Sequence, residues 1–304
     1  MKVFVTGATG FLGTQLCSAL LARGERVVAL TRTLATGQAK LPRSVQLIEG
    51  DPAKAGAWMD AIAGCDAVVN LAGEKVLARW TPELKTRILA SRVQSTRNVV
   101  EAINRAPTPP ALVSASAVGI YGLREDEELD ETSTHGSDFL ATVCAEWEAE
   151  ALKLEKARVA IVRIGVVLGD GGGALEKMLT PYKLFVGGPL GSGRQWLSWI
   201  HIADLVGILL LAIDSPQVRG PVNATAPHPA TMKEFGRALG RALGRPSWAP
   251  VPGFAVKAIF GQAAEILLEG QRVLPRRALS LGYQFKYETL EVALGELVGK
   301  KKAS

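Results

Sequence analysis

The stretch MKVFVTGATGFLG, residues 1–13, decides the fold class of this chain. Its uninterrupted apolar run, residues 3–5, is typical of a central strand covered on both faces. Gly7, Gly10 and Gly13 follow at the spacing of a dinucleotide-binding turn, where they permit a sharp turn, a close approach to a pyrophosphate and tight packing of the next helix. Because 32 glycines in 304 residues also produce accidental spacings, the strand before the motif and the helix after it carry the interpretation.

The next thirty residues complete a βαβ unit and indicate which dinucleotide binds. A helix is expected over residues 14–23, with Gly24 as its stop signal and a second buried strand at residues 27–30. Thr31 and Arg32 end this strand, where NAD-selective sites carry an acidic residue for the ribose. A hydroxyl beside a guanidinium suits a 2′-phosphate instead, although Arg32 could also be a solvated strand-end residue. The missing acid together with the added cation favours NADP(H) as the cofactor.

Composition indicates a soluble globular protein with one large or two modest domains. The hydrophobic fraction is 48% and the charged fraction 21%, with a formal charge of +6 to which a basic tail, residues 300–302, contributes half. No basic stripe with interleaved aromatic residues is visible, so a nucleic-acid partner is not expected. Cys17, Cys65 and Cys144 are odd in number and widely spaced, which favours reduced packing residues. No metal site is expected.

The sequence also predicts a cytoplasmic protein without a membrane partner. No leader segment precedes the first strand, and the longest apolar run, residues 205–213, is too short to span a bilayer.

Two further strands supply candidate cofactor contacts at their carboxyl ends. A third strand, residues 45–48, leads to Asp51, which could reach an adenine amino group or cap the next helix with equal ease. A fourth, residues 66–72, runs into Gly73 and Glu74, where a small residue lets the cofactor pass over the sheet edge. The long helix that follows, residues 82–106, has a basic face that we interpret as mostly solvated; it includes Lys85, Arg87, Arg92 and Arg97.

The fifth strand runs into SASAVGIYG, residues 114–122, and here the chain resembles the extended short-chain dehydrogenase/reductase family. Ser114, Ser116, Tyr121 and Gly122 match that family's serine-rich strand end followed by Tyr-Gly. The resemblance also covers TGATGFLG, residues 70–73, Arg163 and residues 200–204. It implies a Rossmann-type doubly wound parallel α/β sheet with a smaller C-terminal substrate region. Together with the motif it gives the expected cofactor-binding residues: Gly7, Thr9, Gly10, Phe11, Leu12, Gly13, Thr31, Arg32, Asp51, Leu71, Ala72, Gly73, Glu74, Ser114 and Arg163.

The chain departs from this family at the catalytic pair. Catalytic members carry Tyr-x-x-x-Lys on the helix that here spans residues 139–156, and the lysine prepares the tyrosine to exchange a proton. None of the four tyrosines lies in that helix, and Leu140 and Cys144 stand where the pair is expected. The family's catalytic machinery is therefore missing or replaced.

Further stretches resemble one atypical branch, the epimerase-family proteins, also described as nucleotide-sugar epimerase-like. These are Arg79-Trp80, Trp147-Glu148, residues 168–174 and residues 191–201. The resemblance implies NADP(H) binding with an unassigned substrate. The expected substrate pocket comprises Arg79, Trp80, Tyr121, Gln195, Trp196 and Trp199.

Domain boundaries follow from the same motifs. Residues 1–165 with 200–225 are expected to form the nucleotide-binding domain, and residues 166–199 with 226–299 the substrate or lid region, followed by a basic tail, residues 300–304. A sixth strand is expected at residues 159–167, and the glycines of residues 169–173 are interpreted as a lid hinge. Asp204 is expected to cap a helix that starts at residue 205.

Two functions remain open at this stage. The first is an NADP(H)-dependent oxidoreductase or epimerase-like enzyme for a small substrate, an anion among the options. Its nonstandard proton donor would be Ser116, a desolvated Glu146 or Glu148, or His201. The second is a catalytically inactive NADP(H)-responsive regulatory protein. A homodimer through helices 82–106 and 139–156 is also expected, unless the apolar face of the latter packs on its own sheet.

Overall fold

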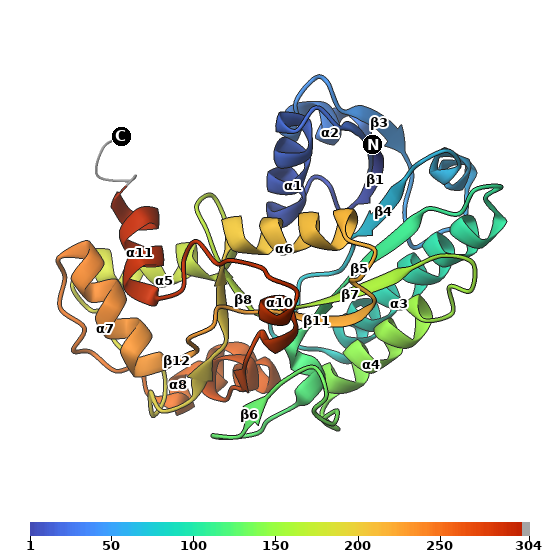
Figure 1. The fold of residues 1–304 in the computed structure, drawn as a ribbon. Helices are drawn as coiled ribbons and strands as arrows, with labels where there is room; N and C mark the ends of the chain where they lie inside the picture. The colour runs from blue at the N-terminus through green and yellow to red at the C-terminus, as the bar shows by residue number, and fades with distance from the viewer. Residues whose placement is uncertain (300–304) are drawn as a thin grey trace.

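A seven-stranded parallel sheet forms the centre of the molecule in the computed structural model, which describes residues 1–299 apart from the side chain of Lys177 (Figure 1). Its strands are β1 (Lys2–Thr6), β2 (Arg26–Thr31), β3 (Gln46–Glu49), β4 (Ala67–Asn70), β5 (Ala111–Ala117), β7 (Val159–Ile164) and β11 (Gly220–Ala224). They lie in the order β11-β7-β5-β4-β1-β2-β3, and every pairing is parallel. The order reverses between β1 and β4, which creates the crevice where doubly wound sheets bind ligands. The predicted fold class is confirmed.

Helices cover both faces of this sheet because its strands are apolar on both sides. On β1, Val3 and Val5 join one core cluster and Phe4 joins another on the opposite face. Helices α1 (Phe11–Ala22) and α6 (Ile202–Asp214) cover the first face, and α3 (Pro82–Arg105) and α4 (Phe139–Ala151) cover the second (Figure 1). Shorter elements connect them: α2 (Leu34–Lys40), the 3-10 helices η1 (Ala57–Ile62) and η2 (Val118–Tyr121), and β6 (Glu128–Leu129).

A second, smaller region with its own core lies beside the sheet. Helices α5 (Gly173–Lys183), α7 (Met232–Leu243) and α11 (Leu290–Gly299) share this core. Two short pairings lie outside the central sheet: β8 (Val166–Leu168) pairs with β10 (Trp199–His201), and β9 (Trp196–Leu197) pairs with β12 (Ala230–Thr231). The remaining elements are α8 (Gly253–Phe260), η3 (Gly261–Ala264), α9 (Glu265–Leu268), β13 (Arg272–Val273), which pairs with β6, and α10 (Arg276–Ser280).

The sixth expected strand is broken at Gly165. A Cβ at this position would lie 2.3 Å from the carbonyl oxygen of Ser198, so the backbone crosses close to that residue and passes from β7 into β8. The single strand expected over residues 159–167 therefore belongs to two sheets.

Asp204 does not cap α6, contrary to the sequence-based expectation. The helix begins at Ile202, and His201 caps it because its Nδ1 accepts a hydrogen bond of 3.1 Å from the Ala203 N–H. Asp204 is fully buried and accepts hydrogen bonds from the Tyr283 hydroxyl and from the backbone N–H of Lys286. Its carboxylate thus holds the segment before α11 against α6.

The apolar face of α4 is buried within its own chain. Ala141, Val143, Trp147 and Ala151 are each at most 5% exposed, and the helix packs on α3, on η2 and on strands β5 and β7. The observation that suggested a dimer contact thus has an intramolecular explanation.

The basic tail of residues 300–304 lies outside the described residues. Within residues 1–299, no helix is both long and apolar enough to cross a bilayer.

Candidate functional site

The glycine turn between β1 and α1 has the geometry of an anion-binding cradle. Gly7 adopts φ +65°, and a Cβ there would lie 2.7 Å from the Leu71 carbonyl at the end of β4. A Cβ on Gly13 would lie 2.3 Å from the Gly7 carbonyl oxygen, so only glycine lets α1 start this close to the turn. Gly10 is the N-cap of α1, and no side chain caps it. The free amides of the first turn and the helix dipole therefore suit a phosphate group.

Two cations lie near the end of β2, beside this cradle. Arg32 is exposed, whereas Thr31 is buried and donates its hydroxyl to the Thr33 carbonyl at 2.9 Å. Lys40, at the end of α2, donates to the Thr9 carbonyl at 3.5 Å. Sequence reasoning missed Lys40, since only the folding of α2 returns it to the glycine turn.

The other expected cofactor residues lie along the carboxyl edge of the sheet, and they differ in exposure and in hydrogen-bond partners. Asp51 Oδ1 accepts from the Ala53 N–H at 3.0 Å, so its carboxylate closes a turn. Glu74 is exposed, and its carboxylate accepts from the Lys75 N–H. Ser114 is buried, and its hydroxyl donates to the Ala115 carbonyl at 3.3 Å. Phe11 packs against the glycine segment after β8, because a Cβ on Gly169 or Gly172 would lie 2.7 Å or 2.8 Å from its ring. That segment therefore closes tightly over the start of α1.

Ser116, Glu148 and Arg163 form a buried network behind the sheet edge. The Ser116 hydroxyl donates to Glu148 Oε1 at 2.6 Å. Arg163 donates through Nε to Glu148 Oε1 at 2.9 Å and through Nη2 to Oε2 at 2.8 Å. Its Nη1 donates to the Tyr121 hydroxyl at 3.0 Å, which in turn donates to Asn223 Oδ1 at 2.6 Å. His135 Nε2 lies 3.3 Å from Arg163 Nη2.

Arg163, expected at the cofactor, and Tyr121, expected in the substrate pocket, both lie inside this network. Both residues are buried, and their polar atoms are engaged within the protein. Burial disfavours the charged guanidinium, but the hydrogen bonds and charge of Glu148 outweigh it and raise the pKa of Arg163. Burial raises the pKa of Tyr121 to about 12. The network therefore ties the end of β7 to α4 and η2, and every nitrogen of the Arg163 guanidinium and the Tyr121 hydroxyl already has a partner within the protein.

Three other expected site residues lie outside this network and make contacts of their own. His201 is buried, with Nε2 3.3 Å from Glu296 and its ring stacked on Tyr287. Trp199 is fully buried and donates its indole N–H to the His228 carbonyl. Arg79 donates to the Ala258 carbonyl of α8 at 3.0 Å.

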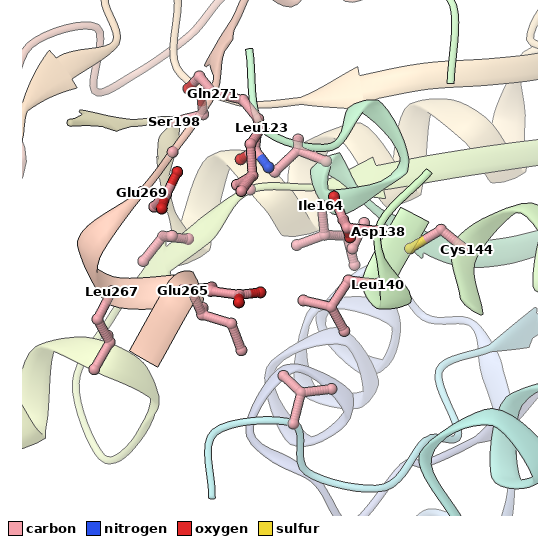
Figure 2. A pocket seen from close by; sticks show the side chains of 18 of the residues that line it. Leu123, Asp138, Leu140, Cys144, Ile164, Ser198, Glu265, Leu267, Glu269 and Gln271 are labelled. Atoms are coloured by element: carbon pink, nitrogen blue, oxygen red, sulfur yellow. Dashed lines mark hydrogen bonds between the residues drawn. The ribbon is translucent and has the colours of Figure 1, made fainter. Parts of the chain in front are cut away.

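A cavity of about 260 Å³ opens at the carboxyl ends of β5 and β7 (Figure 2). Its walls come from α4, the β7–β8 crossing, the segment around β9, and α9. Trp80, Gln195 and Trp196 line it as expected, and Leu140 and Cys144 of α4 also face it. Burial raises the pKa of the Cys144 thiol to about 12, so this position carries no thiolate near neutrality.

The cavity contains charged residues that sequence reasoning missed. Asp138 caps α4 by accepting from the Ala141 N–H at 3.0 Å, while the exposed Glu265 and Glu269 face the cavity from the α9 side (Figure 2). Arg92 lines the cavity from α3, and burial lowers the pKa of its guanidinium. Arg92 was expected on a mostly solvated helix face. Helical periodicity alone does not distinguish a solvated face from one that is turned toward α4. Within residues 1–299, no group of His, Cys, Asp and Glu residues has the arrangement of a metal site.

Comparison with known proteins gives a family match over most of the chain. The family described as NAD dependent epimerase/dehydratase matches residues 3–224, and a domain of unknown function (DUF1731) matches residues 251–297. An Arabidopsis thaliana protein, "Epimerase family protein SDR39U1 homolog, chloroplastic", is 48% identical over 97% of this chain and 86% of its own length. The Bacillus subtilis epimerase family protein YfhF is 39% identical over 99% of both chains.

Solved structures agree with the architecture. The crystal structure of the human epimerase family protein SDR39U1 with NADPH superimposes with a TM-score of 0.87 at 40% identity, over 98% of this chain and 99% of that one. UDP-glucuronic acid 4-epimerase from Bacillus cereus, in complex with UDP-glucuronic acid and NAD, gives a TM-score of 0.82 at 17% identity over 100% and 99% of the two chains. The second likeness concerns the fold alone.

Proposed function

Because the chain belongs to the NAD dependent epimerase/dehydratase family, we propose that it is an NADP(H)-dependent oxidoreductase or epimerase-like enzyme that acts on a small molecule. The observation that carries this proposal is the cavity at the carboxyl ends of β5 and β7. In a parallel sheet these ends share one edge with the glycine turn after β1. A dinucleotide in the turn and a substrate in the cavity would therefore meet.

The turn fits the cofactor on its own geometry. Gly7 and Gly13 leave no room for a Cβ, and the first amides of α1 are free for a pyrophosphate. Arg32 and Lys40 supply positive charge where the 2′-phosphate of NADP(H) would lie, and the human relative is described with NADPH. When bound, this cofactor supplies or accepts a hydride.

The remaining chemistry belongs to the cavity walls. Leu140, Val143 and Ile164 exclude water from one side. The expected donors Ser116 and Glu148 are paired with each other in the interior, and His201 lies against Tyr287. A general acid must reach the proton that it transfers. We therefore assign proton handling to a carboxyl group that lines the cavity, with Glu265 the first candidate.

The test combines cofactor binding with turnover. NADPH fluorescence should report binding to the wild-type protein, and its absorbance should fall when a library of small carbonyl compounds contains a substrate. The Gly13→Ala variant should lose binding, because the new Cβ would lie 2.3 Å from the Gly7 carbonyl oxygen; Gly295→Ala in α11, where nothing lies within 4 Å, is the matched control.

Three results would overturn parts of the proposal. Failure of the wild-type protein to bind NADPH would remove the cofactor assignment. Binding without turnover of any library compound would favour a nucleotide-responsive regulatory protein. Full activity of Glu265→Gln would exclude Glu265 as the proton carrier.

A further inference from the structure

Arg92 contributes a cation to the wall of the cavity. Its Nη1 donates to the Ile88 carbonyl of the same helix at 3.1 Å, and its guanidinium lies 5.2 Å from the ring centre of Trp147. Glu74 attracts it electrostatically, but among residues 1–299 no carboxylate forms an ion pair with it. A guanidinium has five N–H donors, so most of its hydrogen-bonding capacity remains available.

Trp147 supplies a second available donor beside it. The indole of Trp147 is 5% exposed and lines the cavity, yet its Nε1 has no hydrogen-bond partner among the described residues. Buried indole N–H groups usually find an acceptor, because leaving one unpaired is costly. Neither Arg92 nor this indole N–H can accept a hydrogen bond, so the pair suits a ligand that provides acceptor oxygens.

The guanidinium of Arg92 lies close to the segment that follows β4. A Cβ on Gly73 would lie 3.1 Å from Arg92 Cζ, so the guanidinium sits against the end of β4, on the edge that carries the glycine turn. The charge of Arg92 also acts on Cys144, where the resemblance led us to expect a lysine. Arg92 of α3 thus supplies a positive charge near Cys144, where α4 itself carries no lysine.

The rest of the cavity restricts the ligand further. Among the described lining residues Arg92 is the one cation, whereas Asp138, Glu265 and Glu269 are carboxylates, and Figure 2 shows Glu265 directed toward Leu140. These three carboxylates would repel a second negative charge on the ligand, and they favour a neutral or hydrogen-donating group there. A guanidinium binds one carboxylate well through two parallel hydrogen bonds. A dianionic phosphate would have no further cation in this cavity.

We propose that Arg92 and Trp147 form a carboxylate-binding subsite, and that the substrate is a small, largely apolar monocarboxylate held with its anionic end beside the cofactor. This inference rests on the proposed function. It extends that function by fixing the class and orientation of the substrate.

The test compares matched probes on the protein saturated with NADP⁺. Phenylbutyrate and phenylbutyramide share their shape but differ in charge, and calorimetry should show the carboxylate binding at least about tenfold more tightly. Arg92→Met, which keeps the length of the side chain, should abolish this preference while changing NADPH affinity by less than about twofold. Arg87→Met, at an exposed position one turn earlier on α3, should retain the preference.

A further variant addresses the indole. Trp147→Phe keeps an aromatic ring beneath the guanidinium and removes the N–H, so the carboxylate should bind several-fold more weakly while the amide is unaffected. Unchanged carboxylate binding by this variant would exclude Trp147 from the subsite.

Several outcomes would overturn the inference. Equal binding of the two probes, or no binding of either, by the wild-type holoprotein would do so without any variant. A loss of NADPH affinity in Arg92→Met that matches its loss of carboxylate affinity would make Arg92 a cofactor contact. If the wild-type protein binds NADPH but shows no carboxylate preference, only this inference fails; if it does not bind NADPH, the proposed function fails, and the probes can still be compared on the apoprotein.

Discussion

Arg163 is the residue on which the polar contacts behind the sheet edge converge. It joins Glu148 of α4, Tyr121 of η2 and His135 of the loop before α4, so one side chain ties three segments to β7. Its side chain is 4% exposed and that of Glu148 is 6% exposed. A buried charge of this kind is tolerated because its partner is also charged and hydrogen-bonded. Its contribution is to hold the segments that flank the cavity.

Removing the charge of Glu148 should therefore destabilise the fold. Glu148→Gln leaves Arg163 charged and buried, and we expect the free energy of unfolding to fall by about 3–5 kcal/mol. Urea denaturation would measure it. Glu101→Gln, which disrupts the solvent-exposed pair with Arg105 on α3, is the control and should cost less than about 1 kcal/mol. Equal losses in the two variants would contradict a special role for the buried pair.

Arg32 should determine the choice between the two nicotinamide cofactors. Arg32→Ala removes a charged hydrogen-bond donor at the end of β2, so NADPH affinity should fall by about 1.5–3 kcal/mol while NADH affinity barely changes. Fluorescence titration with both cofactors measures the difference. Arg26→Ala, at the opposite end of the same strand, is the matched control. Equal affinity of the wild-type protein for NADPH and NADH would refute the prediction.

At the scale of single elements, helix ends show how local sequence fixes structure. Helix α7 begins with a complete capping box, in which Thr231 Oγ1 accepts from the Glu234 N–H at 3.2 Å and Glu234 Oε2 accepts from the Thr231 N–H at 2.7 Å. The first turn of α1 has no such cap, because Gly10 stands at its N-cap. The contrast separates a helix end closed for stability from one left open for an anion.

The capping box of α7 makes a measurable contribution to stability. Thr231→Ala removes the acceptor for the Glu234 N–H, and the free energy of unfolding should fall by about 0.5–2 kcal/mol. Thr231→Ser keeps a hydroxyl and should retain most of it. Urea denaturation would measure the free energy of unfolding of both variants. A Thr231→Ala variant as stable as the wild-type protein would contradict the role of the cap.

At the scale of the whole molecule, the three cysteines lie in three different core clusters. Cys17 and Cys65 lie in the clusters on opposite faces of the sheet, and Cys144 lies in the cluster under η2. Burial raises the pKa of each thiol, to about 12 for Cys17 and Cys144. Little reactive thiolate is therefore present in the folded protein.

We expect the native protein to react very slowly with a disulfide reagent at mildly alkaline pH. Since a raised pKa lowers the thiolate fraction and burial blocks access, far less than one thiol per chain should react promptly. In denaturant all three should react, because the chain contains three cysteines and each becomes exposed. Prompt reaction of one full equivalent in the native protein would show that one of these cores opens readily.

The sequence by itself determined the sheet and the cofactor edge. Strand and turn signals are local: apolar runs such as residues 3–5, and glycines at positions where a Cβ would meet backbone within 3 Å, as at Gly7 and Gly13. The family resemblance, confirmed by the match over residues 3–224, extended the same assignment along the chain. The apolar run and the spacing of the glycines are patterns of neighbouring residues, so they are visible without the fold, even though the space that Gly7 leaves is needed by Leu71 of another segment.

Only the tertiary structure decided which polar side chains face the cavity. Ser116 and Glu148 are paired in the interior, His201 lies against Tyr287, and Arg92 lines the cavity. Helical periodicity gives the spacing of residues on a face, but it does not say what covers that face. The packing of α3 against α4, and the burial of Arg163, come from contacts between residues far apart in the chain. Long-range packing is therefore the physical reason that the sequence predicts the parallel sheet but not which of these polar side chains line the cavity.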